Sequence, residues 1–96
     1  MKLFLDDIRN PPDNSWVIAR TAKVAIEFLA TGSVEKISFD HDLGDEVNGT
    51  GYEVACFIEQ EVFFERMTCP AWTIHSQNPV GEKNIRAAMM KAEEYN

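Results

Sequence analysis

The sequence predicts a small α/β domain, with a mostly parallel sheet of four strands flanked by about three helices. Short apolar runs alternate with longer segments in which apolar residues recur at helical spacing. Three of the apolar runs end in polar clusters, as expected where parallel strands present their carboxyl ends at one edge. The 96 residues carry no repeat or linker, so we expect residues 1–96 to form a single domain.

The first third of the chain predicts two strands and one helix. Residues 3–5 are a continuous apolar run, which is typical of a buried strand. Residues 9–14 contain consecutive prolines and predict a loop, because proline interrupts both helices and strands. Residues 16–20 are rich in aromatic and β-branched side chains and predict a second strand. Thr21 is a suitable N-cap for a helix that stops at Gly32.

The middle of the chain predicts a third strand and a second helix. Residues 36–39 form the strand, and residues 44–49 form a polar loop after it. Thr50 and Glu53 have the spacing of a capping box, which indicates the start of a helix. The buried stripe of this helix is expected to contain Val54, Ile58 and Val62.

The last third predicts a fourth strand and a third helix. Residues 68–70 break the chain, and residues 71–74 form the strand. Asn78 followed by Pro79 is typical of an N-cap and the first helical position. We expect the tryptophans and phenylalanines to lie in the core. The apolar face of the last helix is expected to contain Ile85, Ala88, Met89 and Ala92.

Composition and charge exclude several classes of partner. The net charge of −7 repels the nucleic-acid backbone, so duplex DNA is not an expected partner. A small nucleotide or an RNA end held through a metal remains compatible with this charge. No apolar run is long enough to span a membrane, and two aspartates interrupt the N-terminal segment before a signal peptide could form. We therefore expect a cytoplasmic protein without a membrane partner, and its oligomeric state stays open.

The cysteines do not indicate a disulfide framework or a zinc site. Cys56 and Cys69 are too few for a framework. Together with His41 and His75 they could supply four zinc ligands, but no closely spaced pair anchors such a site. We expect two reduced thiols.

Three polar clusters are the main pointer to function, because a parallel sheet brings them to the same edge. Crowded carboxylates raise one another's pKa or require a cation, and a divalent ion with oxygen ligands meets that need. We therefore expect Mg²⁺ or Mn²⁺ to bind here, with Asp6, Asp7, Asp40 and Asp42 as ligands. For the first pair alone, an ordinary turn after a strand is an equal alternative. The clusters are Asp6-Asp7, Asp40-His41-Asp42 and His75-Ser76-Gln77-Asn78.

The cationic and titratable side chains of this edge each have two interpretations. His41 and His75 lie beside carboxylates at strand ends, where they could transfer protons or serve only as structural groups. Arg9 follows the first acidic pair in a loop at the same edge. It could grip a phosphate bidentately, or form a salt bridge with one of the aspartates.

Four blocks of the sequence resemble one known family. They are LFLDDIRNPP at residues 3–12, ISFDHDLG at residues 37–44, TGYE at residues 50–53 and HSQNPVG at residues 75–81. The combination resembles the cyclic-phosphate-processing receiver-like family, a reduced relative of the response-regulator receiver domain. The resemblance implies a truncated receiver-like (flavodoxin-like) fold. It also implies a role in processing cyclic phosphate ends, in RNA repair or nucleotide signalling.

The receiver comparison also assigns individual residues. Asp6 and Asp7 match the acidic pair that holds Mg²⁺, Asp40 matches the phosphoacceptor, and Ser76 matches the hydroxyl residue after the fourth strand. The helix that follows the first strand of a receiver is replaced by a proline-containing loop, and the phosphate-binding lysine has no counterpart. Residues that a signalling receiver does not need are His41, Asp42 and His75.

These observations lead to a metal-dependent phosphoesterase as the first hypothesis. Asp40, His41 and His75 are the catalytic candidates, with His75 preferred as the general acid and Asp40 either a nucleophile or only a metal ligand. A degenerate receiver that binds phosphate, a nucleotide or a protein partner without turnover is the alternative. A conventional phosphoacceptor is a weaker third. The candidate phosphate-binding residues are Arg9, Ser76 and Asn78.

Overall fold

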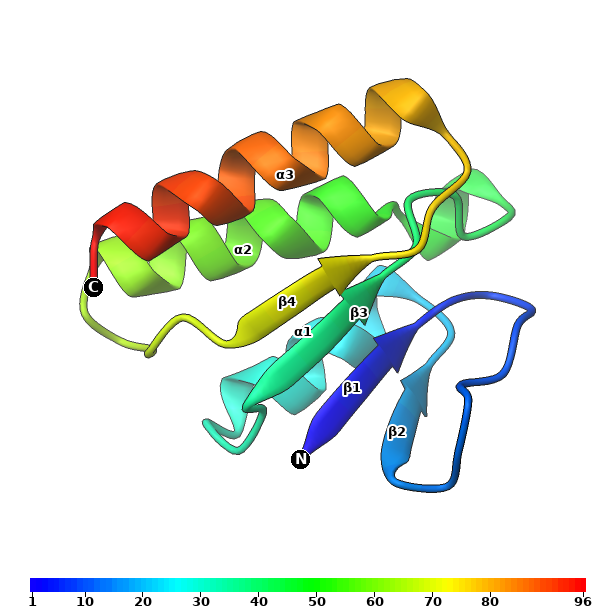
Figure 1. The fold of residues 1–96 in the computed structure, drawn as a ribbon, viewed down its shortest axis with the longest axis horizontal. Helices are drawn as coiled ribbons and strands as arrows, with labels where there is room; N and C mark the ends of the chain where they lie inside the picture. The colour runs from blue at the N-terminus through cyan, green and yellow to red at the C-terminus, as the bar shows by residue number, and fades with distance from the viewer.

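The computed structural model describes residues 1–96 and shows one parallel sheet with the strand order β2-β1-β3-β4 (Figure 1). Every neighbouring pair of strands is parallel, which confirms the predicted α/β architecture. The elements are β1 (Lys2–Leu5), β2 (Trp16–Ala19), α1 (Ala22–Ala30), β3 (Lys36–Phe39), the short 3₁₀ helix η1 (Glu46–Asn48), α2 (Gly51–Phe63), β4 (Ala71–Ile74) and α3 (Pro79–Glu94).

Each α-helix begins at the cap that the sequence predicts. The hydroxyl of Thr21 accepts the N–H of Val24 at the start of α1, and the hydroxyl of Thr50 accepts the N–H of Glu53 at the start of α2. The side-chain oxygen of Asn78 accepts the N–H of Gly81 at the start of α3. These contacts satisfy backbone donors that have no partner within the helix. They also fix the points at which the chain leaves the loops of the carboxyl edge.

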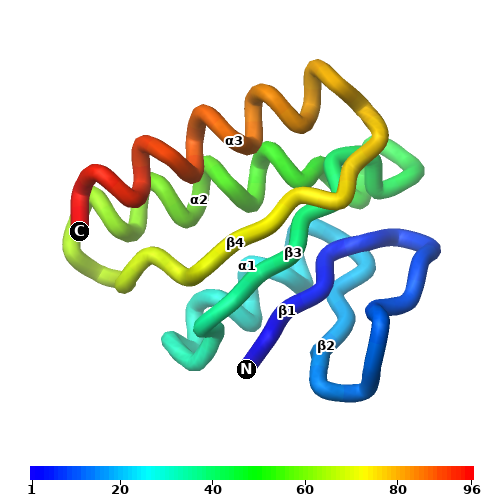
Figure 2. Tube along the Cα trace, viewed as in Figure 1, coloured from blue at the N-terminus to red at the C-terminus, as the bar shows by residue number.

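All three α-helices lie on one face of the sheet. The connections from β2 to β3 and from β3 to β4 advance across the sheet in the same direction, and right-handed crossovers then place their helices on the same face. The connection from β1 to β2 runs in the opposite direction and is an open loop instead of a helix (Figure 2). The opposite face of the sheet therefore has no helix. We call it the helix-free face, and alternation along the strands assigns to it Lys2, Phe4, Trp16, Ile18, Lys36, Ser38, Ala71 and Thr73.

The hydrophobic core lies between the sheet and the helices. Leu3, Leu5, Ile37 and Phe39 of the inner strands are completely buried there. The predicted stripe of α2 is confirmed, since Val54, Ile58 and Val62 belong to the same cluster. The apolar face of α3 is also confirmed by Ile85, Ala88, Met89 and Ala92.

The expectation that all tryptophans and phenylalanines lie in this core is wrong for four of them. Phe4 is buried, but on the helix-free face. Trp16 lies on the helix-free face, where the ammonium groups of Lys2 and Lys36 stand 4.8 and 5.7 Å from the centre of its ring. Phe63 and Phe64 lie at the end of α2 beyond its buried stripe, and they are 55% and 54% exposed. Aromatic character alone does not determine which face of an element a residue occupies.

Two expectations about the rest of the chain can be compared with the structure. Cys56 and Cys69 are free thiols, as predicted. No helix combines the length and the apolar character that crossing a membrane requires.

Candidate metal centre

The carboxyl edge of the sheet holds three polar residues in a fixed backbone frame. Each of them continues the hydrogen-bond ladder by one step beyond the end of its strand, so its backbone position is set by the neighbouring strand. The bonds run from the N–H of Asp6 to the carbonyl of Ala19 (3.1 Å), from Asp40 to Leu5 (2.9 Å) and from His75 to Phe39 (2.9 Å).

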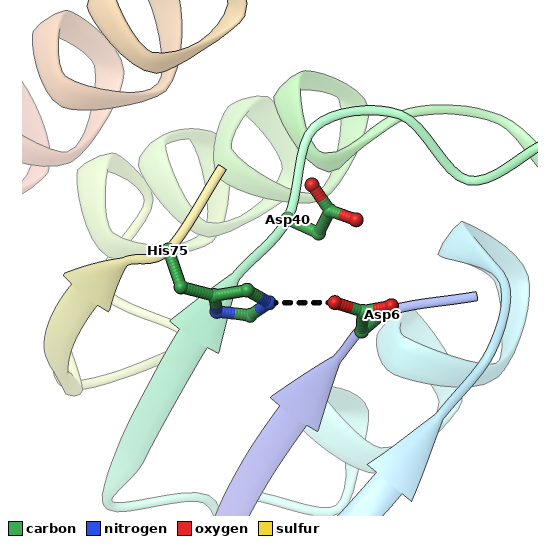
Figure 3. Close-up of side chains that lie close together, drawn as sticks. All are labelled: Asp6, Asp40 and His75. Atoms are coloured by element: carbon green, nitrogen blue, oxygen red, sulfur yellow. Dashed lines mark hydrogen bonds and ion pairs between the residues drawn. The ribbon is translucent and has the colours of Figure 1, made fainter. Parts of the chain in front are cut away.

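The side chains of Asp6, Asp40 and His75 converge at this edge (Figure 3). One ligand atom from each lies within 4.8 Å of the other two. The Nε2 atom of His75 is 3.0 Å from Oδ2 of Asp6. Asp6 and Asp40 are only 1% and 6% exposed, although carboxylates are rarely buried without a compensating partner. The predicted convergence of the strand ends is therefore present for these three residues.

The protein compensates the charge of Asp6. Its Oδ1 atom accepts the N–H groups of Ile8 (2.8 Å) and Arg9 (2.7 Å), and its Oδ2 atom lies 3.4 Å from Nε of Arg9. Burial raises the pKa of Asp6, but the two backbone hydrogen bonds and His75 outweigh that effect and hold the pKa below its usual value. Asp6 is therefore ionised near neutral pH and only accepts hydrogen bonds. It follows that Nε2 of His75 carries the proton in their shared bond.

Asp40 is compensated much less. Its Oδ1 atom accepts the N–H of His41 (2.8 Å), whereas its Oδ2 atom has no hydrogen-bond partner in the protein. Burial raises the pKa of Asp40, and the charge of Asp6 raises it further. The pair thus contains one carboxylate that the protein satisfies and one with a solvent-accessible oxygen that is free to bind a cation. Two carboxylates and an imidazole within this distance form a suitable donor set for a divalent metal ion.

Ser38 holds the other nitrogen of His75 and was missed by the sequence reasoning. Its Oγ atom lies 2.8 Å from Nδ1 of the imidazole. Ser38 is 7% exposed and sits in β3 on the helix-free face. The available signal was a hydroxyl residue within the otherwise apolar segment Ile37-Ser38-Phe39. A buried hydroxyl in such a strand requires a hydrogen-bond partner, and here that partner is the histidine.

A second polar cluster connects the end of β3 to the start of α3. Nδ1 of His41 is 3.0 Å from Oδ1 of Asp42, and the amide nitrogen of Asn78 donates to Oδ2 of Asp42 at 3.3 Å. The hydrogen bonds from His41 and then Asn78 hold the pKa of Asp42 below its usual value. Nε2 of His41 has no hydrogen-bond partner in the protein. The imidazole packs against Gly81, where an added Cβ would come within 2.2 Å of Cγ of His41.

The remaining predicted site residues lie around these two clusters. The side chain of Arg9 is 49% exposed and pairs with Asp6 through Nε, as one of its two interpretations proposed. The hydroxyl of Ser76 accepts the N–H of Asn78 at 3.1 Å. Asp7 is partly buried, and a Cβ at Gly44 would stand 3.2 Å from its Oδ2 atom. The structure therefore does not bring Asp7 and Asp42 into the group formed by Asp6, Asp40 and His75.

Arg20 is a second residue that the sequence reasoning missed. Its Nη1 atom donates to the carbonyl oxygens of Asp6 (3.1 Å) and Arg9 (2.6 Å), and its Nη2 atom donates to the side chain of Asn10 (2.8 Å). These bonds tie the proline-containing loop to the end of β2. Arg20 therefore positions the loop that supplies the two backbone donors to Asp6.

The comparison with known families identifies one family. The family described as the cyclic-phosphate processing receiver domain matches residues 1–91. The chain has no significant match among curated proteins or among solved structures. The family match includes both polar clusters and every element of the sheet. The chain belongs to the cyclic-phosphate processing receiver domain family.

Proposed function

We propose that this domain is a metal-dependent phosphoesterase that opens a cyclic phosphate, either in a cyclic nucleotide or at the end of an RNA strand. The family supplies the class of substrate. The observation that carries the proposal is the convergence of two buried carboxylates and an imidazole, with Oδ2 of Asp40 left without a partner. This oxygen is accessible to solvent and can therefore accept a cation, while burial of the residue and the charge of Asp6 raise the pKa of Asp40 and disfavour its negative charge.

A divalent ion, Mg²⁺ or Mn²⁺, would be held by Asp6, Asp40 and His75. Such an ion polarises phosphoryl oxygens and makes bound water more acidic. The protein contributes the rigid strand ends that hold these side chains in place. Asp40 acts in this proposal as a metal ligand, because its Oδ1 atom is already bound to the N–H of His41.

Arg9 and the first turn of α3 would bind the non-bridging oxygens of the phosphate. Arg9 uses only Nε in its contact with Asp6, so both of its terminal nitrogens remain free to donate to a phosphate. The N-terminus of α3 follows the cap residue Asn78 and adds a partial positive charge and the N–H of Val80, because Pro79 has no N–H and the N–H of Gly81 is bound to Asn78. Ser76 precedes this turn by two residues. Its hydroxyl oxygen accepts the N–H of Asn78, so the hydroxyl proton is free to donate to the phosphate.

His41, in its doubly protonated form, would donate the proton of Nε2 to the ribose oxygen as water attacks phosphorus and the bond from phosphorus to that oxygen breaks. Asp42 is ionised and accepts the proton of Nδ1, which fixes the orientation of the ring, and Nε2 has no partner in the protein. His75, the preferred acid from the sequence alone, has both of its nitrogens engaged, by Ser38 and by Asp6. We therefore assign proton transfer to His41, and metal binding to His75.

A module that binds phosphate or a nucleotide without turnover is the second candidate. One observation favours it: the carboxylate of Asp6 already has protein partners. They are two backbone N–H groups, the side chain of Arg9 and the imidazole of His75. Asp6 therefore needs no metal to compensate its charge. In that case the domain would bind its ligand through Arg9 and the first turn of α3 alone.

An assay of the purified protein distinguishes the two candidates. The substrates are 2′,3′-cyclic and 3′,5′-cyclic nucleotides and an oligonucleotide with a 2′,3′-cyclic phosphate end, each tested with Mg²⁺, Mn²⁺ or EDTA. We expect metal-dependent opening of at least one of them, and its loss in Asp40→Asn. Asp45→Asn is the matched control, because Asp45 is exposed and its side chain makes no capping bond. Binding of a cyclic phosphate without opening would support the non-catalytic module instead.

A further inference from the structure

We infer that His75 binds the ion directly through Nε2, and that the centre therefore prefers a first-row transition-metal dication such as Mn²⁺ to Mg²⁺. The inference rests on the proposed function for the presence of a metal, and it goes further by naming the ligand atom of His75 and the class of ion that it selects. The receiver resemblance alone implies Mg²⁺ held by an acidic pair. The geometry of this edge points to a mixed oxygen and nitrogen centre.

The spacing of the donor atoms of His75 and Asp6 supports direct binding. Nε2 of His75 and Oδ2 of Asp6 are 3.0 Å apart. Adjacent ligands of an octahedral dication with bonds of 2.0–2.1 Å are also separated by about 3 Å. An ion could thus take the place of the shared proton without a change in the distance between the two side chains. Asp40, with its unpartnered oxygen, completes three protein ligands and leaves the other positions to water and phosphate.

The identity of the third ligand determines which ion is preferred. Mg²⁺ takes oxygen ligands and is bound by one or two carboxylates together with water and phosphate. Imidazole nitrogen favours transition ions, and the affinity for them rises along the series that begins with Mn²⁺. Mn²⁺ accepts carboxylates, water and imidazole alike. A centre with two carboxylates and one histidine therefore discriminates against Mg²⁺ through the histidine.

Ser38 allows His75 to change from a hydrogen-bond donor to a metal ligand. In the metal-free protein Nε2 carries the proton, so Nδ1 accepts from the hydroxyl of Ser38. When Nε2 gives its lone pair to an ion, Nδ1 must carry the proton and donate it. A hydroxyl can both donate and accept, and it therefore satisfies Nδ1 in both states. Ser38 is in this sense a positioning residue for the metal ligand.

Electron paramagnetic resonance of bound Mn²⁺ tests the inference without any substrate. We expect a nitrogen coupling from a directly bound imidazole in the Mn²⁺ complex of the wild type. Competition with Mg²⁺ should require at least a tenfold excess of Mg²⁺ to displace half of the Mn²⁺. In His75→Gln the coupling should vanish and the preference for Mn²⁺ should collapse.

Substitutions of Ser38 test its positioning role separately. Partners that orient a metal-bound histidine typically contribute about 10- to 100-fold to metal affinity. We expect Ser38→Ala to weaken Mn²⁺ binding by that order and Ser38→Thr to restore it. Thr73→Ala is the matched control, because Thr73 of β4 is the register neighbour of Ser38 on the same face of the sheet and makes no hydrogen bond to the His75 ring. A purely structural role would lower the melting temperature of Ser38→Ala without changing its affinity for Mn²⁺.

The outcomes separate this inference from the proposed function. Mn²⁺ bound without a nitrogen coupling, or bound equally well by His75→Gln, would overturn the inference and leave the phosphoesterase proposal standing. A nitrogen-coupled Mn²⁺ centre that opens no cyclic phosphate would support the inference and overturn the phosphoesterase. Failure to bind either ion at millimolar concentration would overturn both.

Discussion

The imidazole of His75 lies flat against the ring of Phe4, with ring centroids 4.5 Å apart and an angle of 3° between the planes. Phe4 also meets Trp16 edge-on, with centroids 6.0 Å apart. The orientation of His75 is therefore set from two directions. Ser38 holds one nitrogen of the ring, and Phe4 holds the plane of the ring.

Phe4→Leu should loosen this histidine while keeping an apolar side chain on the strand. Aromatic pairs contribute about 0.5–1.5 kcal/mol beyond the burial of their area, so we expect a stability loss of that order. Affinity for Mn²⁺ should fall as well, because His75 loses its fixed plane. Thermal melting and a Mn²⁺ titration measure the two effects. Phe63→Leu, at an exposed aromatic position, provides the control and should leave the affinity for Mn²⁺ unchanged. If Phe4→Leu also left this affinity unchanged, Phe4 would not position His75.

Addition of a divalent ion should stabilise the fold. A ligand at 100 times its dissociation constant stabilises the native state by about 2.7 kcal/mol. For a domain of this size each kcal/mol raises the melting temperature by about 4–8 °C, which predicts a rise of roughly 10–20 °C over a sample in EDTA. Calorimetry with Mn²⁺, Mg²⁺ and EDTA measures this rise. Asp6→Asn should abolish this rise. A melting temperature that neither ion changes would contradict the metal centre.

The charge of Asp40 should make the metal-free fold less stable at neutral pH than in mild acid. Its pKa lies above the usual 3.8 in the folded protein, because burial and the charge of Asp6 oppose ionisation. The folded state therefore holds this proton more tightly than the unfolded state, and the associated stability is lost as the pH rises through the raised pKa. Asp40→Asn should raise the melting temperature at pH 7 in EDTA, and this gain should shrink as the pH falls toward about 4.

For Asp6 we expect the opposite dependence of stability on pH. Its pKa lies below 3.8, so its contribution to stability is present above that value and is lost as the pH falls through the depressed pKa. Asp6→Asn should therefore lower the melting temperature at pH 7, with a smaller effect in acid. If both substitutions shifted the melting temperature in the same direction at pH 7, the division into a satisfied and an unsatisfied carboxylate would be wrong.

His41 should be essential for turnover but not for metal binding. Removal of a general acid typically lowers the rate by about 10²- to 10⁴-fold. We expect His41→Ala to lose activity by that order while the stabilisation by Mn²⁺ is retained, whereas His75→Gln should lose both. Rate measurements with the cyclic substrate and melting with Mn²⁺ distinguish the two variants. Full activity of His41→Ala would return proton transfer to His75 or to water.

Gly81→Ala should disturb His41 from the opposite side. A Cβ at Gly81 would stand 2.2 Å from Cγ and 2.6 Å from Cδ2 of His41, so the imidazole must move. In an ordinary helix the change would stabilise by about 1 kcal/mol, because glycine is a poor helix former. We expect this gain to be absent and the activity to fall, without a change in Mn²⁺ affinity. Retained activity together with higher stability would mean that the position of His41 is not critical.

The order of elements, the helix caps and the convergence of strand ends could be predicted from the sequence, because they depend on local patterns. The partners of His75 could not. Phe4 and Ser38 lie in apolar strands, and their proximity to His75 depends on the register of β1, β3 and β4. Asp6 and Asp7 follow the same strand, and consecutive side chains point in opposite directions. The sequence alone does not show which of these directions leads to the other strand ends, so it could not distinguish Asp6 from Asp7.

The absence of helices on one side of the sheet leaves strand positions there that take no part in the hydrophobic core. Leu3, Ile37 and Phe39 form the core on one side, whereas the exposed positions Ile18, Ala71 and Thr73 on the other belong to no part of it. Surface substitutions of this kind usually change stability by less than about 0.5 kcal/mol. A library randomised at these three positions should therefore remain largely folded and could be selected for binding of new partners by this face. The bare side of the sheet makes the domain a scaffold for directed evolution.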